Sequence, residues 1–212
     1  MSAKFWHRVT LAAVAMAAGV SSGCGDLVTQ GKSPAQLMLV SLQAASGARP
    51  QDLVSTLLSD VITNVQTSVG GQQVSVPTVF NDVGEATFAL ILKDPGDPAA
   101  PAAPSALNQI TISRYRVVYR RTDGRNTPGV DVPYPFDSAV TVTVPADGTA
   151  TTGFQIVRHG AKQEAPLAAL GTNPDIIATI AEVTFYGRDQ VGNDVSATGT
   201  IGIDFGNFAD PE

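Results

Sequence analysis

The chain has 212 residues, of which 43% are hydrophobic and 15% are charged, and its formal net charge is −6. This length and composition allow one large domain with a packed core and exclude a chain that is disordered throughout. An acidic chain is also unsuited to general nucleic-acid binding, which depends on basic groups that contact phosphates, so no nucleic-acid partner is expected.

The N-terminal residues have the features of an export signal. Lys4 and Arg8 precede an apolar run at 9–20, and the small residues SSG and then Cys24 follow it. A basic start, a short apolar run and small residues are typical of a cleaved secretory signal peptide, here a signal helix at residues 1–23. A 12-residue helix is about 18 Å long, too short for the roughly 30 Å hydrocarbon core of a membrane. The alternative is a buried N-terminal helix.

Cys24 is the only cysteine of the chain and directly follows this segment. Ser22-Gly23-Cys24 resembles the bacterial lipobox, although Ser21 stands where that motif usually has Leu or Val. The resemblance implies cleavage before Cys24 and acylation of this residue, so that lipid anchors the mature protein to a bacterial membrane. In that family, Asp directly after the cysteine favours the inner membrane. Gly25 stands there, so the resemblance implies the outer membrane rather than the inner one.

The mature chain would begin with a tether followed by one domain. Residues 24–34 are small and polar, which is typical of a flexible linker, and a single domain is expected over 35–208. An apolar run at 37–45 predicts a strand, and a second run at 53–62 predicts either a strand or a short helix. The polar segment 63–79 is predicted to be a loop.

Alternating apolar residues predict further strands from Glu85 onward. After a strand that ends near Leu92, the proline-rich segment 94–107 is predicted to be a stiff, extended loop. The next strand covers 110–121, and a change in the phase of its apolar residues predicts a β-bulge near Ser113.

The following segments predict a hairpin and a connection. The valines at 140–144, the turn sequence at 145–148 and the apolar residues up to Ile156 together predict a hairpin. Residues 161–170 are predicted to form a short helix or a turn that crosses between two sheets.

Two strands at 177–186 and 195–205 show the clearest alternation, and a turn-rich segment joins them. They predict an antiparallel hairpin in which four apolar side chains are buried. These are Val183, Phe185, Ile201 and Ile203. Antiparallel strands with one polar face and short turns predict an all-β fold, a β-sandwich.

The turn of this hairpin carries a family resemblance. Asp189-Gln190-Val191-Gly192-Asn193 resembles the turn between the last two strands of bacterial immunoglobulin-like and fibronectin-III-like domains. The resemblance implies an antiparallel, Ig-like (Greek-key) β-sandwich. The Cys…Trp…Cys signature of antibody domains is absent, and the roughly 50 residues before Glu85 leave extra strands or a jelly-roll variant open.

The sequence contains no recognisable catalytic, metal-binding or cofactor-binding motif. His159 is the one histidine of the mature chain and is predicted to lie at the surface, and neither HExxH, a Gly-x-Ser-x-Gly elbow nor a phosphate-binding glycine loop occurs. No cofactor and no metal ion are therefore expected. Asp189, Asn193 and Asp194 offer oxygen atoms to Ca²⁺, but their residue types are equally typical of turns.

Arg114, Arg116 and Arg120 fall on one face of the strand at 110–121. They are candidates for binding an anionic glycan or an acidic protein partner. The alternative is a solvated face with cross-strand pairs to residues such as Glu182.

The expected function is a non-enzymatic structural or binding module, held at the membrane by the lipid on Cys24. The alternative is a periplasmic or surface hydrolase that uses a carboxylate pair. An enzyme of that kind needs a pocket in which carboxylates converge, whereas a binding module does not.

Overall fold

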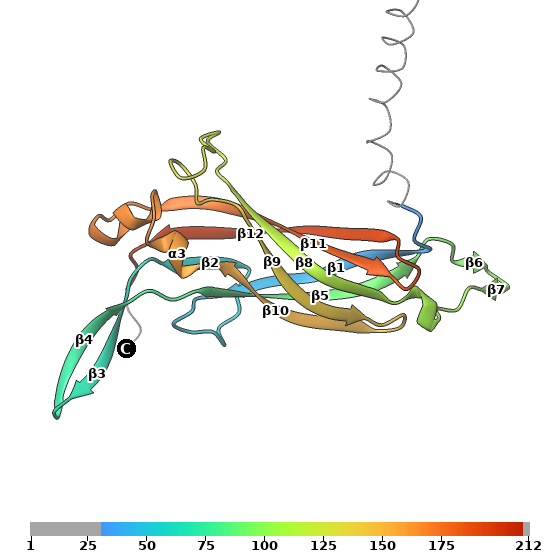
Figure 1. The fold of residues 1–212 in the computed structure, drawn as a ribbon, viewed down its shortest axis with the longest axis horizontal. Helices are drawn as coiled ribbons and strands as arrows, with labels where there is room; N and C mark the ends of the chain where they lie inside the picture. Colours follow the sequence, from blue (N-terminus) through green and yellow to red (C-terminus); the bar gives the residue numbers. More distant parts are fainter. Residues whose placement is uncertain (1–30, 210–212) are drawn as a thin grey trace, which may run out of the picture.

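The computed structural model describes residues 31–209, which form an all-β structure with a few short helical segments (Figure 1). The strands are β1 (Ala35–Ala45), β2 (Thr56–Asp60), β3 (Thr63–Val69), β4 (Gln72–Thr78), β5 (Asp82–Leu92), β6 (Gly96–Asp97), β7 (Ala100–Pro101), β8 (Ile110–Arg120), β9 (Phe136–Val144), β10 (Thr149–Val157), β11 (Ile177–Asp189) and β12 (Asp194–Gly206). The helical segments are η1 (Ala106–Asn108), α3 (His159–Lys162) and η2 (Leu167–Thr172). The prediction of an all-β fold is confirmed. Within residues 31–209, no helix has the length and hydropathy that a membrane span requires.

Two large sheets lie face to face (Figure 1). One has the strand order β1-β5-β10 and the other has the order β2-β12-β11-β8-β9. Most neighbouring strands are antiparallel, as expected, but β2 runs parallel to β12. The expectation of a purely antiparallel arrangement is therefore wrong at this edge. The chain leaves the first sheet after β1 and joins the second sheet at β2.

The core lies between the two sheets and is centred on Phe185 of β11. The centroid of the Phe185 ring lies 4.8 Å from that of Phe88 in the opposite sheet and 5.2 Å from that of Phe154. Phe185 is buried together with Val183, Ile201 and Ile203, as the alternation of the last two strands predicts. The predicted antiparallel β11–β12 hairpin is also confirmed. Edge-to-face packing of aromatic rings adds to the stabilisation that apolar burial provides.

The predicted bulge in β8 is present at Ser113. The register with both neighbouring strands shifts between Ile112 and Arg114. One extra residue moves the following side chains to the other face of a strand. Ile112 before the bulge and Tyr115 after it are therefore both buried in the core.

Two tyrosines of β8 tie the sheets together near the end of β10. The buried Tyr119 hydroxyl donates a 2.6 Å hydrogen bond to the Ile156 carbonyl oxygen, and the Tyr115 hydroxyl accepts one from the Gln155 amide at 3.1 Å. Burial, together with the charge of Asp82, raises the pKa of Tyr119, so its hydroxyl stays protonated and remains a donor. These bonds hold the end of β10 against the opposite sheet.

The predicted hairpin of β9 and β10 is wrong. β9 pairs with β8 in one sheet and β10 pairs with β5 in the other, so the turn at 145–148 carries the chain across the core. Alternation on both sides of a turn shows two strands but not whether they pair with each other. The predicted crossing at 161–170 is correct, because α3 and η2 connect strands of different sheets.

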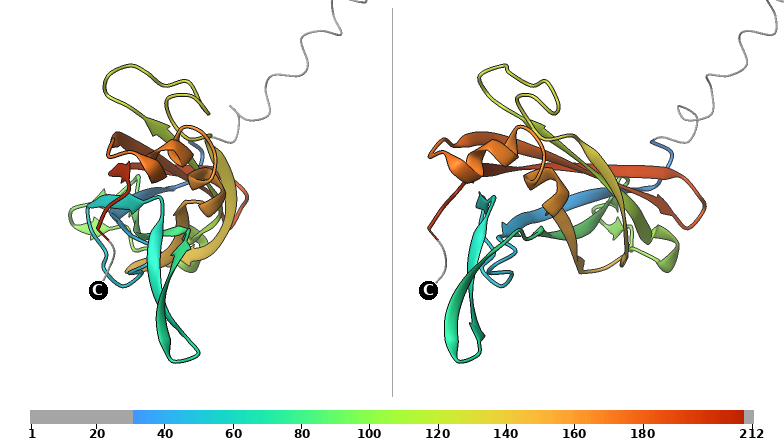
Figure 2. Two further views of the ribbon diagram at one scale, coloured as in Figure 1. Left: turned by 90° about the vertical axis from the view of Figure 1, so that its left-hand side faces the viewer. Right: turned by 60° about the vertical axis from the view of Figure 1, so that its left-hand side comes forward.

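The predicted loop at 63–79 is instead a β-hairpin, made of β3 and β4, and the segment at 53–62 contains the strand β2 rather than a helix. This hairpin projects from the body of the domain (Figures 1 and 2). Gly70 and Gly71 both have positive φ angles, which a tight two-residue hairpin turn requires. Both faces of this hairpin are mostly exposed, so its sequence is polar and lacks the apolar alternation that marks a strand.

Shortening this hairpin should leave the domain stable. Deleting 66–69 and 72–75 removes four facing pairs, keeps the Gly70-Gly71 turn and preserves the register of Val65 with Val76. All the deleted residues are exposed, so the free energy of unfolding should change by less than about 1 kcal/mol, as for other surface changes. Urea denaturation of both chains measures this difference, and loss of cooperative unfolding in the shortened chain would contradict it.

Candidate functional site

The three arginines singled out from the sequence lie exposed on the outer face of β8. Arg114 and Arg116 share the carboxylate of Asp137, at 3.1 and 2.8 Å. The predicted cross-strand pair of Arg120 with Glu182 is present, with a separation of 3.8 Å. A ligand at this face would compete with carboxylates that already neutralise part of the positive charge. A binding role for these arginines stays a prediction.

The residues weighed as calcium ligands form the turn between β11 and β12. Both carboxylate oxygens of Asp189 accept hydrogen bonds within the turn, from the amides of Val191 and Asn193 and from the Asn193 side chain. Burial opposes ionisation of Asp189, but the bonds from Asn193, Ser33 and Val191 outweigh it and lower its pKa. Asp194 pairs with Arg188 at 2.7 Å. These contacts give Asp189 a direct role in turn geometry.

Cys24 and the signal segment 1–23 lie outside the described residues. His159 is exposed, as expected, at the start of α3. Its amide donates a 2.7 Å hydrogen bond to the Asn81 side-chain oxygen, and its ring Nδ1 lies 3.1 Å from the same oxygen. This contact places His159 at the rim of a cleft.

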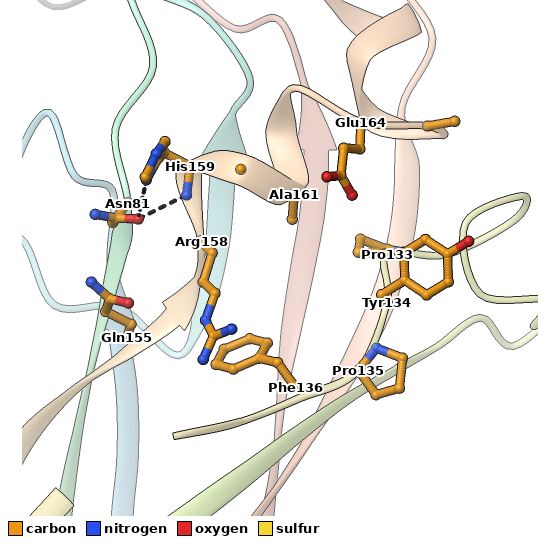
Figure 3. A pocket seen from close by; sticks show the side chains of 12 residues that line it. Asn81, Pro133, Tyr134, Pro135, Phe136, Gln155, Arg158, His159, Ala161 and Glu164 are labelled. Carbon is orange, nitrogen blue, oxygen red and sulfur yellow. Dashed lines mark hydrogen bonds between the residues drawn. The ribbon is translucent and has the colours of Figure 1, made fainter. Parts of the chain in front are cut away.

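The cleft beside His159 has a volume of about 400 Å³ and brings together residues that are distant along the chain (Figure 3). The loop before β9 contributes Tyr134 between two prolines, β9 contributes Phe136, and the segment that follows β10 contributes Arg158 and Glu164. The volume lies in the range of about 300–1,000 Å³ that is common for small-molecule sites. A second cleft, of about 730 Å³, includes Arg114 and Arg188, but both of these arginines pair with carboxylates. The cleft beside His159 instead contains an arginine without such a pair in residues 31–209, and it is therefore the candidate functional site.

Arg158 is the basic group that faces this cleft. Its guanidinium carbon lies 3.9 Å from the centroid of the Phe136 ring, and its Nη2 donates a 2.9 Å hydrogen bond to the carbonyl oxygen of Asp137. Six of the eight arginines in residues 31–209 have a carboxylate partner within 4 Å, and Arg158 is not among them. The stack on Phe136 fixes the plane of a guanidinium whose charge the described residues leave unneutralised.

Tyr134 lines the cleft with a side chain that is exposed but held in one place. Its side chain is 59% exposed, yet its ring lies directly over Gly129. Gly129 has a φ of +76°, and a Cβ atom there would collide with the ring. The loop can therefore hold Tyr134 in this place only with glycine at 129.

A buried ion pair anchors α3, which forms part of one side of the cleft. Lys162 Nζ lies 2.9 Å from Asp82 Oδ1 and donates a 2.8 Å hydrogen bond to the carbonyl oxygen of Asp60. Asp82 also accepts hydrogen bonds from the Ser59 hydroxyl at 2.6 Å and from the Gly47 amide at 3.0 Å. The lysine and aspartate side chains are 1% and 0% exposed. The neighbouring residues Asn81 and Asp82 thus hold the two ends of α3.

Of the residues that line this cleft, the sequence singled out His159 alone. One signal was present, because Tyr134 stands between Pro133 and Pro135 in a loop, where an aromatic residue has no core position to fill. Arg158 gave no such signal, since its partner Asp137 is 21 residues away. The buried Lys162, which anchors α3 beside the cleft, gave none either, since Asp82 is 80 residues away.

Comparisons with protein-family models, with curated proteins and with solved structures found no match for this chain. The cleft offers a fixed guanidinium, an exposed aromatic ring and one carboxylate, that of Glu164. The guanidinium can bind an anion, the ring can pack against an apolar face, and the carboxylate can accept hydrogen bonds.

Proposed function

We propose that this chain is an exported bacterial lipoprotein, anchored by lipid on Cys24, whose Ig-like β-sandwich acts as a binding module at the membrane. The outer membrane is the proposed location. The cleft at Arg158 is the observation that carries the binding function, because it holds a positioned cation with no carboxylate partner among residues 31–209. The lone cysteine after the signal-like segment supports the anchor.

The order of the strands supports the Ig-like part of the proposal. In Ig domains the penultimate strand pairs with both the last strand and a strand from the middle of the chain, and the second strand lies between the first strand and a later one in the other sheet. Here β11 pairs with both β12 and β8, and β5 lies between β1 and β10. The hairpin of β3 and β4 is then an insertion between the first strands of the sandwich.

A binding module is favoured over a hydrolase because of the acids that line the cleft. Glycoside hydrolysis by the usual mechanism uses two carboxyl groups on either side of the scissile bond. Glu164 is the one acidic residue that lines this cleft. Turnover of a glycoside or an ester by the purified protein, abolished in Glu164→Gln, would overturn this part of the proposal.

The anchor is tested by Cys24→Ala. Without the thiol, no lipid can be attached, so the variant should be released from membranes or remain unprocessed, since stable anchoring depends on the acyl chains. Labelling cells with a fatty-acid analogue and separating membranes from soluble protein measures both effects. Label that persists on the Ala variant would contradict the proposed lipidation.

A further inference from the structure

The donor groups of Arg158 select a planar anion. A guanidinium carries five N–H donors in a rigid fork, and the contact with Asp137 uses the Nη2 group. The remaining donors make no hydrogen bond within residues 31–209, while the stack on Phe136 keeps the fork in place. A carboxylate matches this fork with two parallel hydrogen bonds.

The opposite side of the cleft selects a neutral, hydroxyl-bearing part of the same ligand. Glu164 directs its carboxylate into the cleft, and Figure 3 shows it across from Arg158. An ionised carboxylate only accepts hydrogen bonds and repels a second anion. The ligand should therefore place hydroxyl groups, rather than further anionic groups, on this side.

The ring of Tyr134 selects a ligand with a flat apolar face. Pro133 and Pro135 flank this ring, and both line the cleft with it. A sugar ring combines these properties, since its axial C–H groups form an apolar face that packs on an aromatic ring by dispersion. Its hydroxyl groups point to the sides, where the polar residues of the cleft lie.

The geometry points to a sugar with a single carboxylate, a uronic acid residue, as the ligand of the Arg158 cleft. This assignment deepens the proposed binding function but does not depend on the lipid anchor. A single carboxylate is favoured over a polyanionic glycan because removal of Lys4 and Arg8 with residues 1–23 leaves 11 basic and 19 acidic residues, a net charge of −8. A chain of that charge repels a polyanion at long range.

Isothermal titration calorimetry with the membrane-extracted protein tests the assignment. The probes are a disaccharide that ends in glucuronate, its methyl ester and the corresponding neutral disaccharide. The acid should bind at least tenfold more tightly than either neutral probe, because only the acid makes charge-assisted hydrogen bonds to Arg158. Arg158→Met, which keeps an apolar chain over Phe136, should remove this preference.

Arg188→Met is the matched control. It also removes one positive charge, but Arg188 is exposed and pairs with Asp194 outside the cleft, so the affinity for the acid should not change. Tyr134→Ser should weaken the binding of all three probes by the same factor, because it removes the apolar ring and leaves the Arg158 guanidinium unchanged. Thermal unfolding of each variant establishes that it is folded.

Four results would overturn the assignment. These are equal affinity for the acid and its ester, equal loss of affinity in Arg158→Met and Arg188→Met, no binding of the acid, and tighter binding of a peptide with a free C-terminal carboxylate than of the sugar acid. Cys24→Ala protein should bind the acid like the unchanged protein. Failure of the anchor is thereby distinguished from failure of the site.

Discussion

Replacing Lys162 with methionine should lower the free energy of unfolding by about 3–5 kcal/mol, the usual cost of removing one partner of a buried ion pair. Methionine fills most of the space of the lysine side chain but leaves the Asp82 carboxylate buried without its cation. The hydrogen bonds from Ser59 and Gly47 remain, but they do not neutralise the charge. Urea denaturation at neutral pH measures the loss.

Two further variants make this result specific. Lys32→Met removes an exposed lysine and should change the free energy of unfolding by less than about 0.5 kcal/mol. Combining Lys162→Met with Asp82→Asn should recover part of the loss, because the buried charge is then gone. The amide oxygen of asparagine can still accept the hydrogen bond from Gly47, and the Ser59 hydroxyl can accept one from the amide nitrogen. A loss below about 1 kcal/mol in Lys162→Met would show that solvent reaches the pair.

Loss of the ion pair should also loosen the segment that forms one side of the cleft. Lys162 is the last residue of α3, and the segment from Arg158 to Glu164 forms one side of the cleft. Once Lys162 no longer binds Asp82 and the Asp60 carbonyl, the contact of His159 with Asn81 holds this segment from its other end.

Phe185→Ala should cost about 3–5 kcal/mol of unfolding free energy, the range found when a buried phenylalanine is truncated. The ring is fully buried and contacts three other aromatic rings, those of Phe88, Tyr115 and Phe154, drawn from both sheets. Removing it leaves a cavity in the core and takes away a ring that packs against aromatic rings of both sheets. Chemical denaturation followed by circular dichroism measures the change.

Thr184→Ala is the control for this prediction. Thr184 is the preceding residue of β11 and points to the outer face, where its hydroxyl lies 3.0 Å from that of Thr198. Its loss should cost less than about 1 kcal/mol, in line with a net hydrogen bond at the surface. Equal effects of the two substitutions would contradict the burial of Phe185, and so would a helical far-ultraviolet spectrum.

The sequence by itself determined the strands, their faces and one local irregularity. Alternation of apolar residues located β8, β11 and β12, placed Phe185 in the core and located the bulge at Ser113. These features depend on side chains one or two residues apart, because successive residues of a strand point to opposite faces.

Only the tertiary structure decided which strands pair and which side chains converge. β10 pairs with β5 rather than with β9, and β2 pairs with β12 in parallel. Both pairings depend on how the sheets pack and not on the pattern of residues within one strand. The projecting hairpin of β3 and β4 buries few side chains and therefore lacks an apolar signature. The Lys162–Asp82 pair and the Arg158 cleft join residues that are distant along the chain, and no local periodicity records such contacts.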